Sequence, residues 1–205
     1  MDHLEIEIKF FIPDLAPIRH RLRHLGAVCT GQRGFEHNVR YEADDNRLLK
    51  KRCLLRLRKD RTTTLTFKSP PRKIDTRFKT YRELEVGVED FDTMDAILTA
   101  LGFMHRQVYE KWRETWQLGA TMICLDDLPF GSFLEIEGPA EAIMQRVGDL
   151  RLDWDRRILS SYLGLFEALR QKESFPFTDV TFDNFNSVGI RFESWRRLFE
   201  TAKGE

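Results

Sequence analysis

Charged and apolar side chains alternate with a period of two in the stretch LEIEIKFF, which begins at residue 4. In a β-strand this period places Glu5, Glu7 and Lys9 on one face and only apolar side chains on the other. The usual interpretation of a single such strand is a sheet surface with its charges in water. The pattern constrains the fold of this chain because it recurs in strand after strand.

The alternation predicts eight strands along the chain. Residues that break regular structure separate them, among them Pro70, Pro71 and Gly119. The basic stretch RKIDTRFK at residues 72–79 is expected to be an exposed connection between two of the strands. The expected strands cover residues 3–12, 28–42, 53–60, 63–69, 80–88, 104–118, 120–127 and 131–138.

Several segments show helical spacing instead of alternation. Asp14 and Asp92 are expected to cap the first two, which glycines then end. Tyr162, in the fourth, is expected to pack in the core. The expected helices cover residues 14–25, 92–101, 140–148 and 157–171, with a further short helix at 193–202.

At least five further strands repeat the charged face of the first one. Two arrangements fit this pattern: a sandwich with its charges outside, or a closed barrel with its charges inside and its apolar side beneath helices. The amphipathic helices at 14–25 and 92–101 need an apolar surface to cover, which favours the barrel. We therefore predict an α+β fold, with a closed eight-stranded antiparallel β-barrel and flanking helices. The repeated charged pairs are Arg56 with Arg58, Glu83 with Glu85, Lys111 with Arg113, and Glu135 with Glu137. In the strand at 63–69, Lys68 lies on the opposite face from Phe67.

Charges inside a barrel are costly unless they pair with each other or bind something. Paired carboxylates are ligands for hard divalent cations such as Mg²⁺ or Mn²⁺, and here they are Glu5, Glu7, Glu135 and Glu137. Lysines and arginines suit a string of phosphates. The candidate phosphate ligands are Lys9, Arg56, Arg58, Lys68, Lys111 and Arg113.

The order of these motifs resembles the CYTH superfamily, the triphosphate tunnel metalloenzymes. EIEIK at 5–9 is similar to the ExExK signature of that family, and LRLRK, TFK, ELE, KWR and a strand ending in EIE follow in the family's order over roughly residues 3–165. The resemblance implies that a triphosphate binds in the lumen with one or two divalent metals. It also implies a metal and phosphate role for the residues named above, with Glu5, Glu7, Lys9, Glu135 and Glu137 as catalytic residues and Glu83, Glu85 and Asp126 as further lumen residues. The stretch LPFG at 128–131 departs from the commoner turn of the family.

The resemblance leaves the reaction open. A hydrolase would act on inorganic triphosphate, ATP or thiamine triphosphate, whereas a class IV adenylate cyclase of the CyaB-like branch would make cyclic AMP and pyrophosphate from ATP. Phe35, His37 and Tyr41 are possible rim contacts for a cyclase. A polyphosphate-binding module without catalysis could lose its acids, but all four are present here. A structural protein with charged outer faces is the remaining alternative.

The bulk composition limits the partners of this protein. Lys plus Arg and Asp plus Glu are 33 each, so the formal net charge is zero and no whole-molecule field for nucleic acid or membrane is expected. Three cysteines without metal spacing, no signal peptide and no long apolar run indicate a soluble cytoplasmic protein. We expect residues 1–172 to form the barrel domain. Residues 173–205 are expected to be an aromatic appendage that packs on the barrel or on a partner, such as a second copy in a homodimer.

Overall fold

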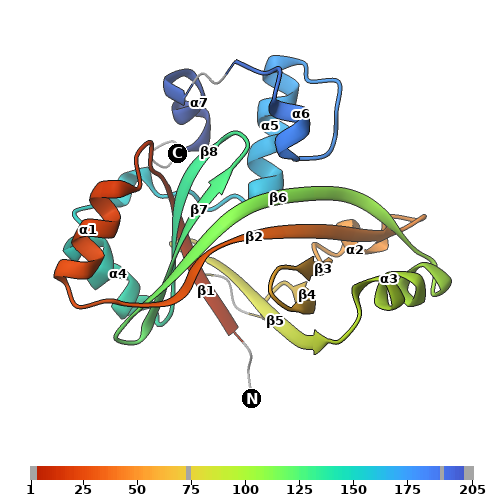
Figure 1. Ribbon diagram of the computed structural model, residues 1–205, viewed down its shortest axis with the longest axis horizontal. Coiled ribbons are helices and arrows are strands. Elements are labelled where there is room, and N and C mark those ends of the chain that lie inside the picture. The colour runs from red at the N-terminus through yellow and green to blue at the C-terminus, as the bar shows by residue number, and fades with distance from the viewer. Residues whose placement is uncertain (1–3, 73–74, 190–191, 201–205) are drawn as a thin grey trace.

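The computed structural model describes residues 4–72, 75–189 and 192–200 of the chain. Its centre is a sheet of eight antiparallel strands with helices around it (Figure 1). Every expected strand is present and its ends lie within one residue of the prediction, apart from residue 3, which is outside the described part. The strands are β1 (Leu4–Phe11), β2 (Val28–Ala43), β3 (Leu54–Lys59), β4 (Thr63–Ser69), β5 (Lys79–Val88), β6 (Phe103–Leu118), β7 (Thr121–Leu128) and β8 (Gly131–Glu137).

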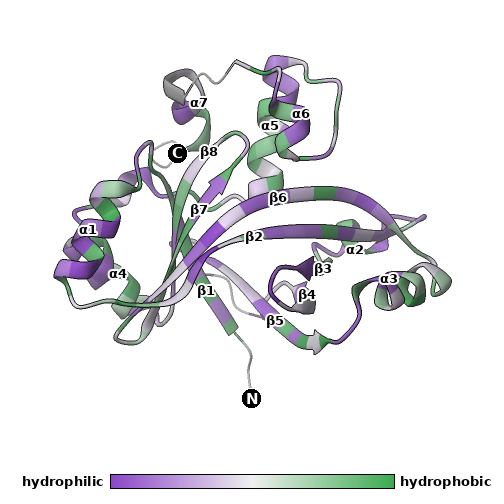
Figure 2. Cartoon of the chain, in the orientation of Figure 1, coloured by the Kyte–Doolittle hydropathy of each residue, from purple (hydrophilic) through white to green (hydrophobic). Residues whose placement is uncertain are grey.

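The sheet closes on itself. The hydrogen-bonded order is β1-β5-β4-β3-β2-β6-β7-β8, and β1 pairs with both β5 and β8, so the ring of strands forms a closed barrel. The long strands β2 and β6 pair along most of their length, with irregularities between Cys29 and Gly34 and again between Arg40 and Tyr41. Polar and apolar residues are interleaved along both of them (Figure 2).

The apolar side of the strands faces outward beneath helices, as predicted. The helices are α1 (Ala16–His24), α2 (Arg47–Lys50), α3 (Phe91–Ala100), α4 (Ala140–Asp149), α5 (Tyr162–Glu173), α6 (Phe182–Phe185) and α7 (Phe192–Phe199). Ile18 and Leu22 of α1 and Ile143 of α4 share one core with Ile8 of β1 and Ile136 of β8. Leu98 of α3 covers a second core, which also contains Val39, Tyr41, Leu55 and Leu57. Burial of apolar surface on this outer side contributes about 25 cal/mol per Å², so the charged side is the one left for the interior.

The aromatic C-terminal part packs against one end of the barrel. Phe185, Trp195 and Phe199 are buried in one cluster with Phe11 of β1 and Phe133 of β8. The Trp195 ring nitrogen donates a hydrogen bond to Glu173 (2.9 Å). The LPFG turn belongs to the same cluster through Phe130, which is fully buried. Gly131 in that turn has φ +150°, and a Cβ there would lie 2.7 Å from the ring of Phe11.

Several expected helix ends were wrong. The side chain of Asp90, not Asp92, caps α3 by accepting a hydrogen bond from Thr93 N (2.7 Å). Asp14 accepts from Ala16 N (2.9 Å), but Leu15 occupies the N-cap position of α1.

The fourth expected helix starts later than predicted. The segment before α5 is extended, because Ile158 N donates to Lys9 O (2.7 Å) and forms a bridge to β1. Ser161 then caps α5. The helix expected at 193–202 corresponds to α7, and its residues 201 and 202 lie outside the described part.

Within the described residues, no helix is long and apolar enough to cross a membrane.

Candidate active site

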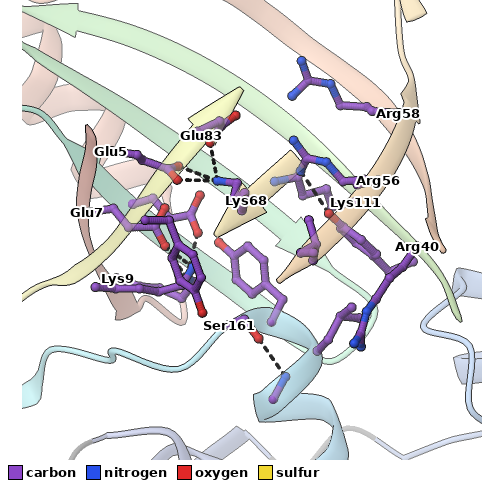
Figure 3. A pocket seen from close by; sticks show the side chains of 18 of the residues that line it. Glu5, Glu7, Lys9, Arg40, Arg56, Arg58, Lys68, Glu83, Lys111 and Ser161 are labelled. Atoms are coloured by element: carbon purple, nitrogen blue, oxygen red, sulfur yellow. Dashed lines mark hydrogen bonds and ion pairs between the residues drawn. The ribbon is translucent and has the colours of Figure 1, made fainter. Parts of the chain in front are cut away.

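The inner side of the barrel surrounds a cavity of about 1320 Å³, and all eight strands contribute side chains to its lining. Twelve of the residues singled out from the sequence line this one cavity (Figure 3). The charged faces of strands far apart in the chain therefore converge. The twelve are Glu5, Glu7, Lys9, Arg56, Arg58, Lys68, Glu83, Glu85, Lys111, Arg113, Glu135 and Glu137.

Strand register explains why these side chains meet. Glu7 lies opposite Glu137 in the β1–β8 pair, and Lys68 lies opposite Glu83 in the β4–β5 pair. Directly opposite residues in antiparallel strands project from the same face, with Cβ atoms about 4.5–5.5 Å apart. A slip of one residue in any pair would turn a whole charged set outward, so the outer cores also fix the inner site.

At one end of the cavity, carboxylates outnumber the bases that neutralise them. Lys68 Nζ lies between two of them, 2.5 Å from Glu5 Oε2 and 2.6 Å from Glu83 Oε2 (Figure 3). Lys79 Nζ lies 2.5 Å from Glu7 Oε1. Glu137 has no basic group of the described chain within 4.0 Å. We call this region the acid end; it comprises Glu5, Glu7, Glu83 and Glu137.

Crowding changes the acidity of these groups. Burial raises the pKa of Glu5 to about 8, and the neighbouring charges of Glu7 and Glu83 add to the rise. Burial, with Glu7 next to it, raises the pKa of Glu137 to about 6. Glu7 is also buried, but the ammonium groups of Lys79, Lys9 and Lys68 together outweigh burial and lower the pKa of Glu7 to about 2. Two of the four carboxyls therefore resist ionisation, as acids do when like charges share a site.

The middle of the barrel is balanced by close ion pairs. Lys9 Nζ lies 2.7 Å from Glu135 Oε1, and Arg113 Nη2 donates to Glu135 Oε2 (2.5 Å). These basic groups hold the pKa of Glu135 well below its usual range despite its burial. We call this region the middle belt; it comprises Lys9, Glu36, Lys111, Arg113, Asp126 and Glu135.

Asp126 is the shared hydrogen-bond acceptor of the middle belt. It is 0% exposed and accepts hydrogen bonds from Lys111 Nζ (3.1 Å), Arg113 Nε (2.7 Å) and the hydroxyl of Tyr162 (2.8 Å). The sequence placed Asp126 at the lumen. Asp126 points inward, as expected, but Lys111 and Arg113 cover its carboxylate. It therefore holds these two bases in place and does not line the cavity.

Tyr162 has a larger part in the site than the core packing expected from the sequence. It is the first residue of α5 and lines the cavity. Lys9 Nζ lies 4.2 Å and Lys111 Nζ 5.3 Å from the centre of its ring, within the range of cation–π attraction. Its hydroxyl group donates to Asp126. One aromatic side chain thus contacts two lysines and the carboxylate behind them.

Two charged residues that belong to the ion pairs described above were missed in the sequence. Lys79 was assigned to the exposed connection at 72–79, but it is the first residue of β5 and pairs with Glu7; residues 73 and 74 of that stretch lie outside the described part. If the expected strand had begun at residue 79 instead of 80, alternation would have placed Lys79 on the same face as Glu83 and Glu85. Glu36 is buried on β2 and lies 3.5 Å from Lys111 Nζ. Gly31, Gly34 and the irregular pairing around them interrupt the alternation of β2, so the sequence pattern did not single out Glu36.

The expected rim contacts of β2 lie on the outer face of the barrel. The Phe35 ring contacts Trp112 at 5.3 Å between centroids. His37 lies near Glu110, and the hydroxyl group of Tyr41 donates to Asp95 of α3 (2.5 Å). The prediction was wrong because these odd-numbered positions have the parity opposite to Glu36, which faces inward.

The acid end has the chemistry of a cation site, although its carboxylates are held on lysines. No three Asp, Glu, His or Cys side chains in the described part of the chain already form a metal-binding group. A divalent cation would compete with Lys68 and Lys79 for carboxylate oxygens that hard cations prefer. Such a cation would relieve the mutual repulsion among the acids, which adds to the effect of burial on the pKa of Glu5.

Residues 3–159 match the family model described as the CYTH domain. A protein of Methanocaldococcus jannaschii that carries the name "Putative adenylate cyclase" is 30% identical over 174 residues, which cover 79% of this chain and 98% of the relative.

Two solved structures illustrate the shared fold. One, from Vibrio parahaemolyticus, is described as a "putative adenylate cyclase" and is 18% identical, with a TM-score of 0.71 over 79% of this chain and 97% of the other. A Hippeastrum protein, described as a "putative adenylyl cyclase" with a dominant triphosphatase activity, is 16% identical, with a TM-score of 0.55 over 80% and 95%. At these identities the likeness concerns the fold alone.

Proposed function

We propose, from the premise that this chain belongs to the CYTH domain family, that it binds a triphosphate inside the barrel and hydrolyses it with the help of a divalent cation. In this reaction water attacks the terminal phosphorus, the adjacent phosphoanhydride bond breaks, and orthophosphate leaves the shortened chain. The barrel is then a triphosphate tunnel.

The observation that carries this proposal is the convergence of bases and acids on one cavity. Lys9, Arg56 and Lys111 are at most 9% exposed, yet all three line the cavity. Buried cations are costly unless they are compensated, and an anionic ligand would add to the compensation that the acids supply. Phosphoryl transfer requires mainly positioning and charge neutralisation, which such a wall of bases provides.

The proposed roles follow the two charged regions. The bases would hold the three phosphates and neutralise the charge that develops on their oxygens. Lys9 lies between Glu135 and the ring of Tyr162, so its ammonium is fixed in place before substrate arrives. The proposed phosphate ligands are Lys9, Arg56, Arg58, Lys68, Lys111 and Arg113.

The acids would hold Mg²⁺ or Mn²⁺. Such an ion, when bound, neutralises phosphate charge and orients phosphate oxygens. Glu137 would contribute most to the attraction, because a lysine or arginine already lies within 4.0 Å of each of the other three acids. The proposed metal ligands are Glu5, Glu7, Glu135 and Glu137, with Glu83 and Glu85 nearby. A cytoplasmic site of action is part of the proposal, since the three cysteines are free thiols.

Cyclisation of ATP is the second candidate, because the relative from M. jannaschii carries a cyclase name. A cyclase needs a pocket for adenine. The side chains expected to serve as rim contacts, Phe35, His37 and Tyr41, lie on the outer face. Hydrolysis needs no such pocket and is therefore preferred.

A substrate panel tests the proposal. The purified protein is offered inorganic triphosphate, ATP and thiamine triphosphate with Mg²⁺ or Mn²⁺, and orthophosphate, pyrophosphate and cyclic AMP are all assayed. Orthophosphate without cyclic AMP is the expected result. Cyclic AMP with pyrophosphate would select the cyclase, and tight triphosphate binding without product would select a non-catalytic module.

Two variants connect turnover to the acids. Glu5→Gln and Glu135→Gln should each lower metal-dependent turnover by about 100-fold or more, the loss typical of removing one charge-stabilising group from an active site. Glu89→Gln is the matched control, because Glu89 is exposed and follows β5 outside the barrel. Unchanged rates in either site variant would remove the metal assignment.

A further inference from the structure

Three more arginines, outside the acid end and the middle belt, line the same cavity. Arg40 lies near the end of β2, Arg52 follows α2, and Arg106 lies on β6; all three line the cavity. Figure 3 shows Arg40 on the opposite side of the cavity from Glu5 and Glu7. We call this group the arginine mouth.

The arginine mouth lacks the ion pairs found elsewhere in the cavity. Within residues 4–72, 75–189 and 192–200, no carboxylate lies within 4.0 Å of the guanidinium nitrogens of Arg40, Arg52 or Arg106. Arg40 Nε is buried and has no hydrogen-bond partner in the described chain. Burial, together with the charge of Arg106, lowers the pKa of Arg40. Glu42 acts on Arg40 and Glu167 on Arg106 from beyond 4.0 Å, so the positive charge gathered here is compensated only in part.

An irregularity in the sheet brings Arg106 into this group. Arg40 pairs with Gln107 across β2 and β6, whereas the next residue, Tyr41, pairs with His105. Arg106 is therefore the extra residue of a bulge on β6. Bulges redirect side chains at the rims of barrels and beside active sites. Regular alternation would place Arg106 on the outer face, because Gln107 and Tyr109 already have the inward parity, but the bulge lets it line the cavity.

The arginine mouth continues the proposed triphosphate site. Arg40 lies directly opposite Arg56 in the β2–β3 pair, on the same inner face. Arg56 is a proposed phosphate ligand and its guanidinium donates to Tyr109 (3.1 Å) and Thr66 (3.1 Å). An anionic chain that passes Arg56 would therefore reach Arg40 next.

We propose that the arginine mouth binds the fourth and later phosphates of a phosphate chain whose first three units occupy the barrel. This inference rests on the proposed function and specifies its substrate class: chains of four or more phosphates. A neutral head group, such as a nucleoside directly after the third phosphate, would leave the buried Nε of Arg40 without a partner, which is costly. An inorganic polyphosphate and a nucleoside tetraphosphate share the required chemistry.

Binding without turnover is the primary test. Calorimetry in the presence of a chelator compares inorganic triphosphate with inorganic tetraphosphate on the full chain. We expect tetraphosphate to bind at least about tenfold more tightly, since each charge-assisted hydrogen bond contributes on that order. Equal affinity for the two chains would overturn the inference while leaving the proposed function intact. Absence of triphosphate binding in chelator and again with added Mg²⁺ would overturn both.

The variant Arg52→Gln/Arg106→Gln assigns the preference to the mouth. Both side chains are exposed, so their replacement should not disturb folding. The double variant should lose the tenfold advantage of tetraphosphate and retain binding of triphosphate. Arg82→Gln is the matched control, because Arg82 is an exposed arginine of β5 with the outward parity. A preference that survives the double variant, or that disappears in the control, would contradict the assignment.

Adenosine tetraphosphate distinguishes the two sources of the chain. If it binds as tightly as inorganic tetraphosphate and responds equally to the double variant, the mouth accepts a chain that ends in a nucleoside. If only the inorganic chain shows the effect, free polyphosphate is the ligand. If ATP instead loses affinity in the double variant as strongly as tetraphosphate does, the mouth holds a nucleoside and the inference is wrong.

Discussion

The acid end and the arginine mouth are opposite regions of one cavity. At the acid end three of the four carboxylates contact lysines, and Glu137 has no basic group of the described chain within 4.0 Å. At the mouth three arginines have no carboxylate within 4.0 Å among the described residues. The remaining charges form the middle belt, where Lys9, Lys111 and Arg113 are each in contact with acids.

The difference separates charges that hold the structure from charges available to a ligand. A buried ion pair whose hydrogen bonds are satisfied is costly to break, so the belt fixes the interior of the barrel. Unbalanced charge of one sign destabilises the protein until a counter-charge binds. The two ends carry such imbalances with opposite signs. A divalent cation at one and an anionic chain at the other would correct both.

The belt should show the largest effect on stability. Asp126→Asn removes the charge that Lys111, Arg113 and Tyr162 share and leaves two buried cations short of compensation. The free energy of unfolding should fall by about 3–5 kcal/mol, the usual cost of breaking a buried pair. Denaturant unfolding measures it. Asp127→Asn is the control, because Asp127 is partly exposed and bonded to Ser132. Equal losses in the two variants would mean that the belt has no special role.

Most of the fold could be predicted from the sequence because its pattern is local. Charged and apolar side chains alternate regularly at residues 4–9 of β1 and 134–137 of β8, so the inward faces of these strands could be named from parity, whereas that of β2 could not. Closure into a barrel needed a second argument, the apolar surface required by the helices at 14–25 and 92–101. Helix starts were less predictable. Whether Asp90 or Asp92 caps α3 depends on which backbone N–H groups are free, and Ile158 is held in an extended segment by β1.

The site was predictable where side chains keep strand parity and not where the backbone departs from it. Glu5 and Glu137 follow the period and were found. Arg106 lines the cavity through a bulge, which no spacing announces. Tyr162 enters from a helix, so strand parity could not place it. The site residues that strand parity could not predict thus come from a bulge in β6 and from helix α5.

The acid end should be stabilised by protons in the absence of metal. The pKa of Glu5 is raised from 4.5 to about 8, so between these pH values the folded state keeps a proton that the unfolded state has released. Stability should therefore fall as pH rises through this window, with Glu137 acting in the same direction. The lowered pKa of Glu7, about 2, affects stability only at lower pH.

Thermal melts in chelator from pH 5 to 9 measure this slope. The melting temperature of Glu5→Gln should fall less steeply than that of the parent, by several degrees at the alkaline end, since 1 kcal/mol corresponds to about 2–4 °C in a protein of this size. Glu89→Gln should keep the parent slope. If the Glu5→Gln and parent curves run parallel, Glu5 is not held protonated and the acid end is less crowded than the geometry indicates.

Removing one hydroxyl group from the belt should have the smallest effect. Tyr162→Phe keeps the ring beneath Lys9 and Lys111 but deletes the hydrogen bond to Asp126 (2.8 Å). Asp126 retains its two basic partners, so the loss should be about 1 kcal/mol, or roughly 2–4 °C in melting temperature. Tyr162→Ala would also remove the ring and should cost more, in both stability and triphosphate affinity. If phenylalanine is as harmful as alanine, the hydroxyl group and not the ring positions the lysines, and the belt depends on Asp126 alone.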